Sequence, residues 1–281
     1  MKRNSPSRED ERHINLMRTR ILLALATVLN VTLNGAETNS AAPVKVPAKE
    51  RFHLYLLMGQ SNMAGRGKIE AEDQTPHPRV LTLDSNGVWQ PAVEPVTHDK
   101  PQVLGVGPGV SFGKTMAQKY PDATIGLVPC AFGGTPLKRW QKDGDLYSNA
   151  VYRAKLAMKT GTLKGVLWHQ GESDSTPALA KTYGERLDQM IRDLRADLDS
   201  PNLPFVAGQL GEFLYTRGSN NVAEVRLVND TLARLPERVP NTGCASSASL
   251  NHKGDQLHFD TASQRELGRR YAGEMARLQR P

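Results

Sequence analysis

The chain has 281 residues, of which 38% are hydrophobic and 23% charged, a composition typical of a soluble globular protein. Its formal net charge is +7, yet it holds no basic run and no basic stripe interleaved with aromatic residues. We therefore expect no nucleic-acid partner.

The first 36 residues have the pattern of a secretory signal peptide. A polar segment with six basic residues ends at Arg20, an apolar stretch covers 21–33, and small residues follow at 34–36. Met17 is an alternative start that would give a more compact basic region. The other reading is a disordered tail that contains an apolar stretch by chance.

Several expectations follow from a signal peptide at 1–36. The apolar stretch is shorter than the roughly 20 residues that span a bilayer, so no stable membrane insertion is expected after cleavage. Cleavage near Ala36 would lower the formal charge to +4, because the removed part holds six basic and three acidic residues. We expect a secreted or periplasmic protein with a linker at 37–50 and one domain at 51–281.

Within that domain, short apolar runs alternate with helical patterns. Strands are expected at 52–58, 79–83, 124–130, 164–168, 204–210 and 240–247, and helices at 109–120, 147–160, 178–198, 221–235 and 261–279. This alternation predicts an α/β protein, a three-layer αβα sandwich around a doubly wound, mostly parallel sheet. The segment 84–108, rich in proline and glycine, is expected to be a long irregular loop of the kind that is usually functional or mobile.

Two cysteines, Cys130 and Cys244, lie in apolar or small-residue segments. In an oxidising compartment they could form a disulfide, and otherwise they would be buried thiols. The sequence leaves both readings open.

A glycine and a serine follow the first expected strand. Gly59 allows a sharp turn as the chain leaves the strand. This turn would place Ser61 at the carboxyl edge of the sheet, where open α/β proteins bind ligands. Because Gly-x-Ser is a common pattern, a catalytic role depends on what the other strand ends supply.

Asp255 and His258 lie just before the last expected helix. An aspartate three residues ahead of a histidine can fold back and hold one imidazole nitrogen, which leaves the other free to take a proton from a serine. Alone, such a pair is more often a surface feature. Its place next to a strand end makes it a candidate base for Ser61.

Two further strand ends carry groups suited to an acyl-transfer site. Gly133 and Gly134 can expose backbone N–H groups toward a developing negative charge, although a tight turn is the simpler reading. In His169-Gln170-Gly171-Glu172, the Gln170 amide is a further candidate donor and Glu172 a second carboxylate for His258. Because the carboxyl ends of the strands lie close together, one active site explains all of these motifs.

These motifs resemble the four sequence blocks of the SGNH (GDSL-like) hydrolases, over about 52–278. The matching segments are Gly59-Gln60-Ser61-Asn62-Met63, Gly133-Gly134-Thr135, His169-Gln170-Gly171-Glu172 and Asp255-x-x-His258-Phe259. More narrowly, they resemble the sialate O-acetylesterase and carbohydrate esterase family 6 branch. In the wider family an aspartate and an asparagine occupy the positions held here by Gln60 and Gln170.

The resemblance implies a flavodoxin-like sheet (the SGNH hydrolase fold) and a serine esterase. Its substrate would be an O-acetylated carbohydrate of the acetylxylan or sialate type, cleaved through an acetyl-enzyme without a metal or organic cofactor. Ser61 would be the nucleophile and His258 the general base, with Asp255 and Glu172 both serving His258.

The oxyanion hole would combine the N–H groups of Ser61 and Gly134 with the Gln170 amide. The expected substrate contacts are Gln60, Asn62, Arg139 and Trp140, although a surface salt bridge and a packed indole explain the last two equally well.

Three alternatives remain open. His252, Asp255 and His258 are metal-ligand types at a spacing of three, but a metal site leaves Ser61 unexplained. A non-catalytic carbohydrate-binding domain could use the same scaffold, because a fold does not fix a function. An SGNH esterase or lipase acting on non-carbohydrate esters is the third. The sequence specifies neither the sugar nor the oligomeric state.

Overall fold

The structure is a computed structural model that describes residues 44–218 and 221–280. The expected signal peptide and the first part of the linker lie outside the described residues, so both stay predictions.

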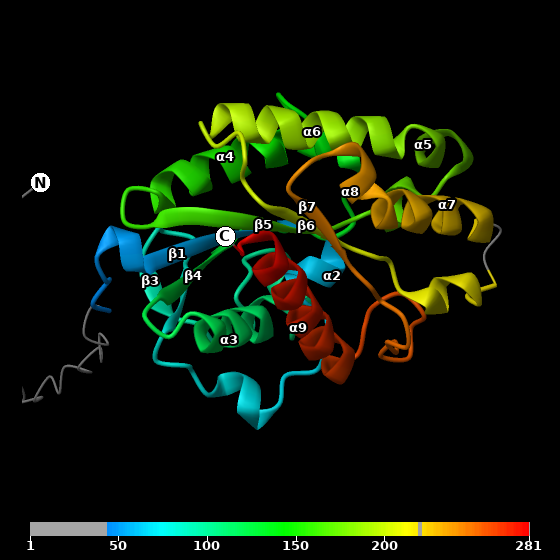
Figure 1. Ribbon diagram of the computed structural model, residues 1–281. Helices are drawn as coiled ribbons and strands as arrows, with labels where there is room; N and C mark the ends of the chain where they lie inside the picture. The colour runs from blue at the N-terminus through cyan, green and yellow to red at the C-terminus, as the bar shows by residue number, and fades with distance from the viewer. Residues whose placement is uncertain (1–43, 219–220, 281) are drawn as a thin grey trace, which may run out of the picture. The chain divides into compact units, whose positions relative to one another are not determined.

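A seven-stranded sheet forms the middle of the domain, in the order β3-β2-β4-β1-β5-β6-β7 (Figure 1). The strands are β1 Phe52–Gly59, β2 Val80–Leu83, β3 Trp89–Pro91, β4 Thr124–Pro129, β5 Thr162–His169, β6 Phe205–Gly208 and β7 Thr242–Ala245. All neighbours pair in parallel except β2 and β3. The order β4-β1-β5-β6-β7 is the flavodoxin-like doubly wound arrangement, and β2 and β3 extend its edge.

Helices cover both faces of the sheet (Figure 1). They are α2 Ser61–Ala64, α3 Gly109–Lys119, α4 Asp145–Ala157, α5 Pro177–Lys181, α6 Tyr183–Asp197, α7 Val222–Ala233, α8 Leu235–Arg238 and α9 Thr261–Leu278. α3 and α9 pack together on one face, and α4 and α6 lie on the other. The predicted three-layer αβα sandwich is confirmed. Among the described helices, none has both the length and the apolar character needed to cross a bilayer.

Burial explains why the strands were readable from sequence. Seven of the eight residues of β1 are buried, and His53 alone is partly exposed. A parallel strand with helices on both faces must be apolar nearly throughout, so it appears as a continuous hydrophobic run. On α6, the residues Tyr183, Leu187, Met190, Ile191 and Leu194 are buried, as their helical spacing predicted.

The structure differs from the sequence-based expectation at three places. The segment 84–108 is not wholly irregular, because β3 pairs with β2 and the Trp89 ring packs edge-on against Phe52 with a centroid distance of 4.6 Å. The single helix expected at 178–198 is divided into two helices, α5 and α6. The helix expected at 221–235 corresponds to α7, which ends at Ala233. Pro236 then stands in the first turn of α8, the one part of a helix that tolerates proline.

The two cysteines are free thiols. Cys130 directly follows β4 and Cys244 lies in β7, with β1, β5 and β6 between these strands. At about 4.8 Å per strand spacing, the two positions are roughly 19 Å apart, beyond the reach of a disulfide. The disulfide reading is therefore wrong for this fold.

Candidate active site

Ser61 lies at the carboxyl end of β1, near the centre of the sheet. Gly59 has a φ of +130°, and a Cβ there would lie 2.1 Å from the carbonyl oxygen of His169, so the turn requires glycine. The chain then enters the short helix α2, whose first residue is Ser61. As the first residue of a helix, Ser61 has a backbone N–H with no intrahelical partner.

A closed loop at 251–260 carries the candidate base. His252 and Phe259 form an antiparallel bridge, and the Lys253 N–H donates to the His258 carbonyl at 2.9 Å. Inside the loop, Asp255 Oδ1 accepts the backbone N–H groups of Leu257 and His258 at 2.9 and 2.8 Å. The backbone of its own loop therefore holds the Asp255 carboxylate in place, independently of its contact with the imidazole.

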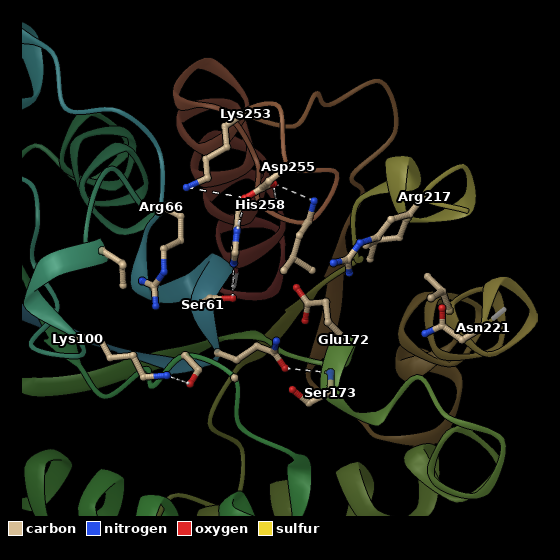
Figure 2. Close-up of a pocket in the computed structure, with 17 residues that line it drawn as sticks. Ser61, Arg66, Lys100, Glu172, Ser173, Arg217, Asn221, Lys253, Asp255 and His258 are labelled. Carbon is tan, nitrogen blue, oxygen red and sulfur yellow. Dashed lines mark hydrogen bonds and ion pairs between the residues drawn. The ribbon is translucent and has the colours of Figure 1, made fainter. Parts of the chain in front are cut away.

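Folding brings Ser61 and His258 together although they are 197 positions apart. His258 Nε2 lies 3.0 Å from Ser61 Oγ, and His258 Nδ1 lies 2.7 Å from Asp255 Oδ2 (Figure 2). Because a carboxylate only accepts, Nδ1 carries the hydrogen and Nε2 presents its lone pair to the serine hydroxyl. This is the arrangement in which an imidazole can remove the serine proton.

The electrostatics of the pair suit a general base. Burial lowers the pKa of His258, and the nearby charges of Lys253 and Arg66 act in the same direction, although the Asp255 carboxylate opposes them. Partial burial acts to raise the pKa of Asp255, but hydrogen bonds from His258 and Leu257 outweigh it and lower that pKa to about 2. At neutral pH the imidazole is therefore neutral and the carboxylate is charged.

The glycine pair after β4 forms a turn beside Ser61. The buried Asp99 holds this turn in place, because its Oδ2 accepts the Gly133 N–H at 2.9 Å and pairs with Arg66 Nη2 at 2.7 Å. Gly134 has a φ of +73°, lines the pocket and is exposed. Its N–H has no partner among the residues that the structure describes. Gly134 and Ser61 therefore offer two backbone donors at the pocket.

The expectation for Gln170 is wrong. Its side chain is fully buried and does not line the pocket. The amide nitrogen donates to the Thr135 carbonyl at 3.1 Å and to Asp174 Oδ2 at 2.7 Å, which uses both of its hydrogens. Gln170 thus supports the turn that follows Gly134 and has no hydrogen left for an oxyanion.

Glu172 and Asn62 contact each other in place of their expected partners. Asn62 Nδ2 donates to Glu172 Oε1 at 2.7 Å, and Asn62 also contacts Leu257 and Phe259 of the 251–260 loop. Glu172 lines the pocket, but the carboxylate on the His258 imidazole is Asp255. Burial raises the pKa of Glu172. Glu172 therefore does not share the task of Asp255, and the fully buried Asn62 ties α2 to the loop and is no substrate contact.

The remaining expected substrate contacts divide into one that reaches the pocket and two that do not. Gln60 lines the pocket, while its Oε1 accepts the Ser173 N–H at 3.4 Å. Trp140 is fully buried against Trp168 and donates to Thr135 Oγ1, and Arg139 pairs with Asp145. For Arg139 and Trp140, the plainer readings of a salt bridge and a packed indole were the correct ones.

The pocket around Ser61 has a volume of about 480 Å³. Sequence reasoning missed all four of its cationic residues, which are Arg66, Lys100, Arg217 and Lys253. Arg66 follows Ser61 by five positions, and Lys100 lies in the segment 84–108, which the sequence predicted only to be a long irregular loop. No local pattern marks Arg217.

The metal-site alternative does not fit this geometry. His252 Nδ1 accepts the backbone N–H groups of Gly254 and Gln256, and both nitrogens of His258 face Asp255 and Ser61. Over 44–218 and 221–280, no three side chains of metal-ligand type converge.

A serine on the turn after the central strand, faced by an Asp-x-x-His loop before the last helix, defines an SGNH-type hydrolase. Comparison with known protein families identifies one family within this class. The family described as "Carbohydrate esterase, sialic acid-specific acetylesterase" matches residues 51–277. The chain belongs to this family.

Individual proteins are similar to this chain in sequence or in structure. A probable carbohydrate esterase of Arabidopsis thaliana is 36% identical over 235 residues, which are 76% of this chain and 86% of that protein. A solved Arabidopsis thaliana structure superposes with a TM-score of 0.72 at 33% identity, covering 80% of this chain and 98% of that one. The structure of NanS shares the fold, with a TM-score of 0.67 at 17% identity over 83% of this chain and 98% of that one.

Proposed function

We propose that this protein is a serine esterase that removes O-acetyl groups from carbohydrates. The single observation that carries the proposal is the hydrogen-bonded chain from Ser61 Oγ through His258 to Asp255, with distances of 3.0 and 2.7 Å. Membership of a carbohydrate esterase family supports an acetylated sugar as the substrate.

In the first half-reaction, His258 Nε2 takes the proton of Ser61 while Oγ attacks the acetyl carbonyl carbon. The N–H groups of Ser61 and Gly134 stabilise the tetrahedral oxyanion, and removing one such donor commonly costs about 2.7–4 kcal/mol. The carbon–oxygen bond to the sugar then breaks, and the departing sugar oxygen takes the proton from His258. The product is a free hydroxyl on the sugar and an acetyl ester on Ser61.

In the second half-reaction, water attacks the acetyl-serine and gives a proton to His258. Collapse of the second tetrahedral intermediate releases acetate and returns the proton to Ser61. Asp255 stays ionised in both halves and stabilises the imidazolium that forms in each.

Acetate release by variants tests this proposal. Ser61→Ala and His258→Ala should each lose nearly all hydrolysis of acetylated sugars while keeping the circular dichroism spectrum of the parent. Ser173→Ala is a matched control, because Ser173 lines the same pocket without an imidazole partner, and it should keep most of the activity. Turnover by Ser61→Ala close to that of the parent would refute the assignment.

The identity of the acetylated sugar requires a separate test. Acetylated xylo-oligosaccharides, as in carbohydrate esterase family 6, and O-acetyl sialosides are both candidates. A screen for acetate release over both, together with long-chain acyl esters, separates them. Hydrolysis of long-chain esters alone would favour the lipase-like alternative.

We also propose export of the protein by cleavage of a signal peptide near Ala36, on the basic, apolar and small-residue pattern of 1–36. N-terminal sequencing of protein recovered from the periplasm or the medium tests this. Recovery of the uncleaved chain from the cytoplasm would contradict it.

A further inference from the structure

Cationic side chains stand around the mouth of the pocket. Lys100, Arg217 and Lys253 are all exposed, and they come from three separate segments: the turn before the 3-10 helix 101–103, the segment after the 3-10 helix 212–215, and the 251–260 loop. Figure 2 shows Lys100 and Arg217 on opposite sides of Ser61, with Lys253 on a third.

The acidic residues of the pocket do not pair with Lys100 or Arg217. Asp255 is engaged by His258, and Glu172 is buried against Asn62 with a raised pKa. Among the described residues, Lys100 and Arg217 form no ion pair with any carboxylate. Lys100 Nζ donates to the Gly133 carbonyl at 3.1 Å and lies 5.7 Å from the centroid of the Phe132 ring.

The other two cations of the pocket already have tasks. Arg66 is buried and paired with Asp99. Lys253 Nζ lies 3.8 Å from Asp255 Oδ2, and its charge helps to keep His258 neutral. Lys100 and Arg217 thus carry charge that the proposed chemistry at Ser61 does not use.

We propose that the preferred substrate is an O-acetylated acidic oligosaccharide, whose uronic-acid-type carboxylates bind Lys100 and Arg217 while the acetyl ester lies at Ser61. The inference rests on the proposed esterase function and specifies its substrate class. Because Lys100 and Arg217 lie on opposite sides of Ser61, they match an oligomer, which places carboxylates on both sides of the acetylated sugar. Exposed positive charges around a cleft also raise the local concentration of anionic ligands.

The test compares two forms of one acetylated oligouronide, the free acid and its methyl ester, which differ in charge but not in the acetyl group. We expect kcat/KM for acetate release to be about tenfold higher for the free acid at low ionic strength, and the ratio to shrink toward one in about 0.5 M salt. An O-acetyl sialoside, with its single carboxylate, should be a poorer substrate than the free-acid oligomer.

Variants then test which residues cause the preference for the free acid over the methyl ester. Arg217→Gln and Lys100→Gln should each lower the acid-to-ester ratio by about fivefold, the upper end of what one exposed ion pair contributes. Lys159→Gln is the matched control, because Lys159 is exposed in the turn after α4, does not line the pocket, and its loss removes the same charge. This control should leave the ratio unchanged.

Three results would overturn the inference: equal or faster cleavage of the methyl ester, an unchanged ratio in the Arg217 and Lys100 variants, or a sialoside preferred over the oligomer. A small chromogenic acetyl ester separates this failure from that of the proposed function. Ser61-dependent hydrolysis of the chromogenic ester without an acid preference defeats only the substrate inference. No hydrolysis of any acetyl ester defeats both.

Discussion

The substitution Asp255→Asn tests which of two carboxylates, that of Asp255 or that of Glu172, acts on His258. The side-chain oxygen of the new amide can still accept the N–H groups of Leu257 and His258, so the loop should keep its shape. The amide nitrogen, however, would face His258 Nδ1. This donor favours the tautomer with the proton on Nε2, which no longer has a lone pair for Ser61.

The electrostatic part of the loss follows from the geometry. In the transition state, His258 becomes an imidazolium whose Nδ1 lies 2.7 Å from Asp255 Oδ2. For charge centres about 4 Å apart, Coulomb's law gives about 1 kcal/mol in water and about 4 kcal/mol at an effective dielectric of 20. The Asp255 side chain is 36% exposed, so we discount for solvent and expect about 2–3 kcal/mol. That corresponds to a roughly 30- to 160-fold lower kcat, with the tautomer change adding to it.

The assay is steady-state acetate release by Asp255→Asn and Glu172→Gln, with urea unfolding of each variant to show that the fold persists. Glu172→Gln retains an oxygen for Asn62, so we expect a much smaller loss. If Asp255→Asn stayed within about threefold of the parent, or Glu172→Gln lost more, the assignment of Asp255 as the partner of His258 would be wrong.

Three further predictions concern pH and stability. Because the pKa of His258 lies below its usual 6.5, kcat/KM should rise to half its plateau below pH 6.5; an inflection above about pH 7 would contradict this. Burial raises the pKa of Glu94 to about 8, so its contribution to stability, present below pH 4.5, is lost as pH rises toward 8. Urea unfolding of Glu94→Gln should therefore gain on the parent by about 1.4 kcal/mol per pH unit between about pH 5 and 8, and parallel curves would contradict it. Asp99→Asn leaves the buried Arg66 unpaired and should cost about 3–5 kcal/mol of unfolding free energy as well as turnover; an unchanged urea midpoint would contradict it.

The parts of the site that sequence reasoning found are those fixed by short-range rules. A strand followed by glycine positions Ser61, and Asp255 reaches His258 within a single loop, so both features were readable from local spacing. The sheet was readable for a similar reason, because β1 and its parallel neighbours are buried on both faces and hence apolar.

The parts that it missed depend on contacts between distant segments. Gln170 was expected to donate to the substrate, but Thr135 and Asp174 take its hydrogens, and no spacing rule reveals that saturation. Trp140 stands close in sequence to the glycine pair, yet the core takes its ring. Lys100 and Arg217 reach the pocket only because loops without a sequence pattern fold toward it.

Covalent labelling with a serine-directed fluorophosphonate, mapped by peptide mass spectrometry, tests the central assignment most directly. We expect one labelled residue, Ser61, with labelling slowed strongly in His258→Ala and nearly unaffected in Ser173→Ala. An unlabelled Ser61 in folded protein, or labelling at equal rate without His258, would contradict a nucleophile activated by that histidine.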